Sequence, residues 1–272
     1  MIDKFRKIFR KFPALFKVLS RVYQTFVAPI ESGHVQYYIK YLFTLKYSEV
    51  KKLKYYGFEN IKPVNYREWR IGKGKDHAYR RYYLGKYHGK KCFIKIGKND
   101  ATVENECLFG EQFSHAELTF SPNFLIGDSS FDTNTTMVAV EYLEGLQKFT
   151  VPTSIEEFSN LCVQFNYILD VLLKNDIVHA DIHKGNLMTQ NGKLVLMDYG
   201  ISMKKSSGNK IDYNARPGTF YRENLKNRIY DDAFSFVEMI QELNLPEVFI
   251  SVDEFQKIVS KIGRNYVNVK LK

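Results

Sequence analysis

The segment 177–200 constrains this chain more than any other stretch of its sequence. His179, Asp181 and Asn186 form an H-x-D-x-x-x-x-N array, and the triplet Asp198-Tyr199-Gly200 follows it. A lone H-x-D is commonly a surface loop with a capping Asp, but the whole array followed by D-x-G is far more restrictive. Two carboxylates and an amide supply oxygen atoms that suit Mg²⁺ and a proton-accepting base. The segment predicts a reactive site, provided that these side chains meet in space.

The residues between the array and the triplet predict how they meet. Residues 187–190 and 193–197 have the pattern of two short strands joined by Asn191-Gly192. This dipeptide tolerates the positive φ values of a tight hairpin turn. The hairpin would bring the two carboxylates and the amide to one end of a small sheet.

Together these motifs resemble the catalytic and metal-binding loops of the protein-kinase-like fold. The resemblance implies a phosphotransferase with ATP as its donor. It also implies that Asp181 orients and deprotonates an acceptor hydroxyl, while Asn186 and Asp198 hold Mg²⁺.

An upstream glycine pair resembles the nucleotide loop of the same fold. Residues 71–79 carry Gly72 and Gly74, and glycines let backbone N–H groups approach phosphates closely. Downstream, Cys92-Phe93-Ile94-Lys95 aligns with the strand that ends V-A-I-K in kinases. The resemblance implies that Lys95 reaches the α- and β-phosphates of ATP.

A helix predicted over residues 101–113 would supply the acidic partner of Lys95. Glu104 is followed four residues later by Leu108, which is the spacing of the kinase helix whose Glu pairs with the strand lysine. Glu106 is the alternative, since it lies only two positions further on.

The apolar run 137–143 predicts a buried strand that leads into a hinge. The resemblance implies that Glu141 and Leu143 present backbone groups to the adenine ring, with Val140 at the back of the pocket.

Three features of this sequence favour a small acceptor over a protein. Ala180 stands where regulated protein kinases carry an Arg that grips a phosphorylated loop, and His183 stands where Ser/Thr kinases have a Lys. The string over residues 179–186 is similar to that in kinases of antibiotics and choline. The short C-terminal lobe and the Arg-Pro-Gly run that starts at Arg216 look similar to lipopolysaccharide core sugar kinases. This resemblance implies a sugar or other alcohol acceptor, and a membrane-borne glycan is the expected carrier of that hydroxyl.

Two alternatives stay open. A protein Ser/Thr kinase is suggested by Gly218-Thr219 and by Asp232 in a D-x-x-S-F motif. A pseudokinase scaffold belongs to a different class, and the presence of Lys95 together with both carboxylates and the amide argues against it.

Charge is concentrated at the N-terminus. Residues 1–63 carry 13 Lys/Arg and 4 Asp/Glu, whereas the rest carries 27 and 26, within a net charge of +10. Residues 1–26 combine basic side chains with a Phe-rich stripe at helical spacing, which predicts binding to an anionic membrane surface. A helix packed on the protein body is the alternative. A Tyr- and Lys-rich stretch over residues 34–56 allows nucleic acid only as a minor alternative, since no recognition motif accompanies it.

Length and composition fit an α+β, bilobal kinase-like fold. The chain has 272 residues, 44% of them hydrophobic, and three scattered cysteines that favour a reducing compartment. No apolar run reaches the roughly 18 residues needed to span a bilayer. We expect a cytoplasmic protein, or one on the cytosolic face of a membrane. The predicted parts are a basic extension (1–63), an N-lobe (64–143) and an abbreviated C-lobe (144–272).

Overall fold

The computed structural model describes residues 46–64, 79–113, 118–206, 222–224 and 227–270. Mixed helices and sheets confirm the α+β class. The chain forms two compact units, Met1–Ile94 and Lys95–Lys272, and the division falls inside one strand. The three predicted domain boundaries stay predictions. The predicted glycine loop, the segment 1–26 predicted to bind a membrane and the start of the Arg216 run lie outside the described residues.

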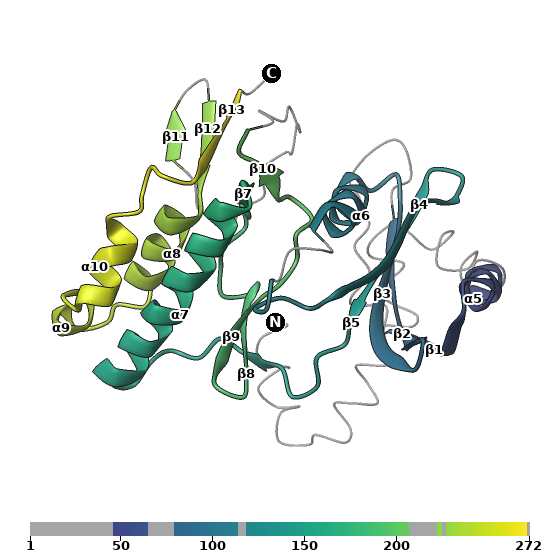
Figure 1. The fold of residues 1–272 in the computed structure, drawn as a ribbon, viewed down its shortest axis with the longest axis horizontal. Helices are drawn as coiled ribbons and strands as arrows, with labels where there is room; N and C mark the ends of the chain where they lie inside the picture. The colour runs from purple at the N-terminus through teal and green to yellow at the C-terminus, as the bar shows by residue number, and fades with distance from the viewer. Residues whose placement is uncertain (1–45, 65–78, 114–117, 207–221, 225–226, 271–272) are drawn as a thin grey trace, which may run out of the picture. The chain divides into compact units, whose positions relative to one another are not determined.

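The described part of the first unit is one helix followed by antiparallel strands (Figure 1). Gly57, with φ +88°, ends the helix, and His88-Gly89 make the tight turn between two strands with φ values of +47° and +77°. In this unit β2 lies between β1 and the start of β3. The elements are α5 (Lys46–Tyr55), β1 (Phe58–Pro63), β2 (Tyr79–Tyr87) and β3 (Lys90–Lys98).

The second unit opens with the end of β3, a helix and a hairpin. In this unit β5 lies between β3 and β4 in the sheet. Val103 and Cys107, one turn apart on the helix, pack against Val138 of β5. The predicted helix over residues 101–113 is confirmed, and the predicted strand over 137–143 is shifted two residues toward the N-terminus. The elements are α6 (Ala101–Phe113), β4 (Phe124–Asp132) and β5 (Thr135–Glu141).

The second unit also contains a helical core, in which α7, α8 and α10 lie side by side (Figure 1). Ser154 caps the first of these helices by accepting a hydrogen bond from the Glu157 N–H at 3.1 Å. Phe165 and Phe236 stack with ring centroids 3.8 Å apart, which joins two helices in one hydrophobic core. The helices are α7 (Ile155–Lys174), α8 (Asp232–Gln241), α9 (Glu247–Ile250) and α10 (Asp253–Val259).

Short strands frame the predicted reactive segment. The expected hairpin is confirmed as β8 and β9, and its turn residues Asn191 and Gly192 have φ values of +51° and +75°. The sheets are β6-β8-β9, β10-β7 and β11-β12-β13. Their strands are β6 (Gln147–Lys148), β7 (Ile177–Val178), β8 (Leu187–Gln190), β9 (Lys193–Leu196), β10 (Met203–Lys204), β11 (Arg222–Asn224), β12 (Asn227–Asp231) and β13 (Tyr266–Lys270).

Within the described ranges, none of the helices has both the length and the apolar character needed to cross a bilayer.

Candidate active site

The loop between β7 and β8 carries the first half of the site, and a buried carboxylate at the start of α8 holds it. The two oxygens of Asp232 accept hydrogen bonds from the backbone N–H groups of His179 at 2.8 Å and Ala180 at 2.9 Å. Ala180 is buried and has φ +65°, a conformation that costs a non-glycine residue energy. The paired hydrogen bonds therefore stabilise a strained turn immediately before Asp181.

Burial dominates the electrostatics of Asp232. Loss of water around this carboxyl raises its pKa from 3.8 to about 7, although both backbone hydrogen bonds act in the opposite direction. Sequence reasoning identified Asp232 only through its motif and missed its contact with the loop. The signal was present as an acidic residue at the first position of a largely apolar helix.

His179 is a fully buried structural residue of this loop. Its Nδ1 accepts a hydrogen bond from the Asp181 N–H at 3.3 Å, so its Nε2 carries the proton and donates to the Met197 carbonyl at 3.1 Å. Burial lowers the pKa of His179 to about 4, against the pull of nearby carboxylates. The neutral ring thus joins the Asp181 loop to the end of β9.

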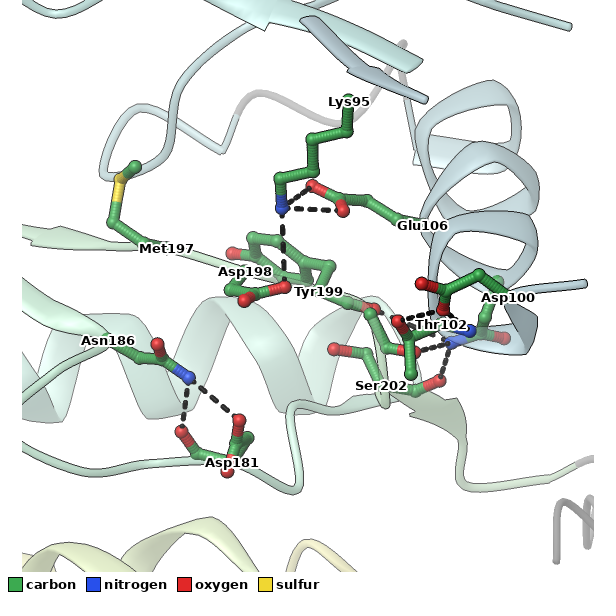
Figure 2. Close-up of polar contacts among 12 residues, drawn as sticks. Lys95, Asp100, Thr102, Glu106, Asp181, Asn186, Met197, Asp198, Tyr199 and Ser202 are labelled. Carbon is green, nitrogen blue, oxygen red and sulfur yellow. Dashed lines mark hydrogen bonds and ion pairs between the residues drawn. The ribbon is translucent and has the colours of Figure 1, made fainter. Parts of the chain in front are cut away.

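Asp181 and Asn186 lie together, as the sequence predicted. The Asn186 Nδ2 donates to Oδ2 of Asp181 at 2.9 Å and to its backbone carbonyl at 3.0 Å (Figure 2). The amide oxygen of Asn186 faces away from Asp181 in this view. This arrangement holds a partly exposed carboxylate in place beside an amide oxygen suited to a hard cation.

The second half of the site is an ion-pair cluster around Lys95. Lys95 Nζ lies 2.8 and 2.7 Å from the two carboxylate oxygens of Glu106, and 3.3 Å from Oδ1 of Asp198 (Figure 2). Lys95 and Glu106 are buried, whereas the Asp198 side chain is 30% exposed. The backbone of Asp198 has φ +66°. A buried ammonium thus lies beside a carboxylate that remains accessible from outside.

The predicted pairing of Lys95 with Glu104 is wrong, and the alternative, Glu106, is the partner. Glu104 is exposed, whereas Glu106 shares the buried face of α6 with Val103 and Cys107. Two positions along a helix correspond to a rotation of about 200°, so these two glutamates point to opposite sides.

Asn105 ties α6 to the residues after Asp198. Its Nδ2 lies within hydrogen-bond distance of three carbonyl oxygens, those of Tyr199 at 3.4 Å, Gly200 at 3.2 Å and Ser202 at 2.9 Å. The helix that carries Glu106 and the triplet that carries Asp198 are therefore positioned together. Sequence analysis did not single out this residue.

A cavity of about 100 Å³ lies beside Glu106, bounded by α6, β4, β5 and the ring of Tyr199. Val140, predicted at the back of the adenine pocket, lines it. Glu141 ends β5, and its N–H donates to the Asn123 carbonyl at 2.8 Å, so that N–H is already used. Leu143 lies just beyond and is partly buried. The adenine contacts of Glu141 and Leu143 stay predictions.

The donor atoms present fit Mg²⁺. Among the described residues no group of three or more His, Cys, Asp or Glu side chains could hold a metal alone. A magnesium ion bound with a nucleotide needs only one or two protein oxygens, because phosphates and water complete its coordination. The Asp198 carboxylate and the Asn186 amide oxygen meet that requirement.

One family model matches part of this chain. Residues 131–229 match the model of the ABC1 atypical kinase-like domain. This segment is shorter than half of the chain; it contains Asp181, Asn186 and Asp198 and begins after Lys95. No match was found among the curated proteins.

Among solved structures, the chain is similar to the kinase PK-1 of Cydia pomonella granulovirus, with 20% identity and a TM-score of 0.38. The match covers 51% of this chain and 55% of the viral chain, so this chain spans about half the length of that kinase. The narrower resemblance to lipopolysaccharide core and small-molecule kinases stays a prediction. The matched family model and the arrangement of the site residues support a protein-kinase-like fold for this chain.

Proposed function

We propose that this protein is an ATP-dependent phosphotransferase that transfers the γ-phosphate to a hydroxyl group. One observation supports this most strongly. Lys95 contacts both oxygens of Glu106 and lies 3.3 Å from Asp198, a carboxylate that stays partly exposed. A buried lysine held between two carboxylates is positioned to exchange its contact with Asp198 for phosphate oxygens when Mg·ATP binds.

The remaining site residues have complementary roles. Asp181 orients the acceptor hydroxyl and receives its proton, while the Asn186 Nδ2 fixes one oxygen of that carboxylate. The Asn186 amide oxygen and the Asp198 carboxylate would hold Mg²⁺, which neutralises charge on the phosphates when bound. Positioning and charge neutralisation account for most of the catalysis of phosphoryl transfer.

We further propose that the acceptor is a sugar or another small alcohol. A protein substrate must lay an extended segment across the C-terminal lobe, whereas a hydroxyl needs only the space beside Asp181. Ala180 and His183 replace the Arg and Lys that protein Ser/Thr kinases carry at these positions.

The decisive experiment is transfer of radiolabelled γ-phosphate by the full chain, with membrane glycolipid extract and generic protein acceptors assayed in parallel. Label in the glycolipid fraction supports the proposal. Labelling of protein Ser/Thr alone would favour the protein kinase. A chain that binds Mg·ATP and transfers nothing in any arm, including to water, would favour the scaffold.

Asp181→Asn tests the assigned base in the same assay. The amide cannot accept the proton, so turnover should fall by about 100-fold or more, while Mg·ATP affinity stays within about twofold. Near-normal turnover by this variant would contradict the assignment of Asp181 as the base.

We also propose that residues 1–26 attach the protein to the cytosolic face of an anionic membrane. Each Lys or Arg close to such a surface contributes about 1 kcal/mol, and buried Phe side chains add a contribution that salt does not screen. Co-sedimentation with anionic liposomes should fall when residues 1–26 are deleted. Equal sedimentation of both proteins would favour a helix packed on the protein body.

A further inference from the structure

His183 is held in one orientation by the loop that carries Asp181. The Gly185 N–H donates a hydrogen bond to Nδ1 of His183 at 2.9 Å. Because this nitrogen accepts, the proton of the neutral ring lies on Nε2. The backbone thus selects one tautomer and sets the direction of the remaining N–H group.

Gly185 also leaves the space that this ring occupies. A Cβ atom at position 185 would lie 2.7 Å from Cε1 and 3.0 Å from Nδ1 of His183. These distances are shorter than van der Waals contact, so any larger residue there would push the imidazole aside. The two residues therefore form one unit, in which the glycine donates to the ring and makes room for it.

The protonated nitrogen of this ring lies beside Asp181. The distance from His183 Nε2 to Asp181 Oδ1 is 3.6 Å, which is longer than a hydrogen bond. The other oxygen, Oδ2, accepts from Asn186 at 2.9 Å. The side chains of His183 and Asp181 are 33% and 23% exposed, so a substrate can reach both of them.

We propose that His183 binds the acceptor hydroxyl, an inference that rests on the phosphotransferase function proposed above. The hydroxyl oxygen accepts a hydrogen bond from Nε2–H of His183 and donates its own hydrogen to Oδ1 of Asp181. As its oxygen bonds to the γ-phosphorus, the bond from that phosphorus to the β,γ-bridging oxygen breaks. The hydroxyl proton passes to Asp181, ADP leaves, and the imidazole keeps its proton throughout.

This arrangement defines the chemical class of the acceptor atom. An alcohol oxygen can accept from the imidazole and donate to the carboxylate at the same time, whereas an ammonium group has no lone pair to accept with. The neutral ring also brings no positive charge to the phosphates, unlike a lysine ammonium at the same position. His183 therefore acts on the acceptor rather than on the nucleotide.

The mutual dependence of His183 and Gly185 makes the inference testable with matched variants. In His183→Ala the donor is lost, and in Gly185→Ala the new methyl group displaces the ring. Both should lower Mg·ATP hydrolysis, with water as the acceptor, by about 10- to 100-fold, since small misplacements of reacting groups have effects of that size. The affinity for Mg·ATP should not change in either variant.

The double variant separates displacement of the ring from general damage to the loop. Once His183 is alanine, the methyl group at position 185 has no ring to displace, so the double variant should match His183→Ala. His183→Gln places an amide N–H near the position of Nε2 and should recover part of the activity, whereas His183→Asn should not. The inference would be overturned if the losses of hydrolysis in the two single variants multiplied in the double variant. It would also be overturned if both single variants hydrolysed Mg·ATP at the wild-type rate.

The tautomer can be measured without any turnover. Long-range ¹H–¹⁵N NMR of the full chain, with the His183 signal assigned from His183→Gln, should show the proton on Nε2. A proton on Nδ1 would overturn this inference and leave the phosphotransferase proposal standing. A wild-type chain with the Nε2 proton, but with neither Mg·ATP binding nor turnover, would refute the phosphotransferase function itself.

Discussion

Two buried glutamates in this chain pair with cations, and they differ in what surrounds them. In the first unit Glu49 of α5 contacts Arg81 and Tyr83 of β2, with the Glu49 and Arg81 side chains only 7% and 2% exposed. In the second unit Glu106 contacts Lys95, and these two side chains are 10% and 11% exposed. Burial and pairing alone do not distinguish the two.

A third group makes the difference. Lys95 has a second carboxylate, Asp198, at 3.3 Å, and that carboxylate is 30% exposed. The Glu49 carboxylate instead contacts a guanidinium and a phenol that are themselves buried. The first pair therefore joins a helix to a strand, while the second holds an ammonium beside an accessible carboxylate. The accessible carboxylate beside Lys95 is what makes the second pair the candidate for a functional role.

Breaking the structural pair should give the largest effect on stability. Glu49→Ala removes the carboxylate that both Arg81 and Tyr83 contact, and leaving a buried charge without its partner costs about 3–5 kcal/mol. Urea denaturation should show this loss. The control is Glu59→Ala, an exposed glutamate of the same unit, which should change the free energy of unfolding by less than about 0.5 kcal/mol. Similar losses in both variants would contradict a special role for the buried pair.

Asp232 extends the comparison to a buried carboxylate held by backbone N–H groups. Its pKa is raised to about 7, so between pH 4 and 7 the folded state binds more protons than the unfolded state, and this group makes stability fall as pH rises. The pKa of His179 is lowered from 6.5 to about 4, so this group makes stability rise with pH between those values. The two contributions oppose each other over most of the same range.

Asp232→Asn should separate the contribution of Asp232 to the pH dependence of stability from that of His179. The variant loses the contribution of Asp232 and keeps that of His179, so its free energy of unfolding should increase with pH between 4 and 6.5 more steeply than that of the wild type. The difference in slope is at most about 1.4 kcal/mol per pH unit for one group. Urea denaturation at a series of pH values measures both slopes. If the free energies of unfolding of the wild type and the variant change with pH in parallel, the pKa of Asp232 does not change on folding.

The Lys95–Glu106 pair should respond mainly in binding. Glu106→Gln weakens the hold on Lys95 but leaves Asp198 beside it, so Mg·ATP affinity should fall by about tenfold, in line with the loss of one charged hydrogen bond. Titration with a fluorescent ATP analogue measures this change. Glu104→Gln, on the exposed face of the same helix, is the matched control and should bind as the wild type does. A larger loss in Glu104→Gln would reinstate the pairing that the structure contradicts.

Local patterns were enough to predict much of this protein. The Asn191-Gly192 turn predicted the hairpin of β8 and β9, because a two-residue turn sets the register of its strands. Residues 101–113 were correctly predicted as a helix. The positions of Asp181 and Asn186 were also predictable, since the two are five residues apart and their contact lies within one loop.

Contacts between distant segments were decided only by the tertiary structure. The choice of Glu106 over Glu104 depends on which face of α6 packs against β5, and a sequence in which both positions are glutamate does not specify that face. The two loop residues that Asp232 contacts lie 52 and 53 positions away from it in the sequence. Glu49 and Arg81 are 32 positions apart. Short-range spacing determines helices, turns and loops through local sterics and hydrogen bonds. The partner of a buried charge is determined by the packing of whole elements, because the energetic cost of burying it is offset only where a complementary group arrives from elsewhere in the chain.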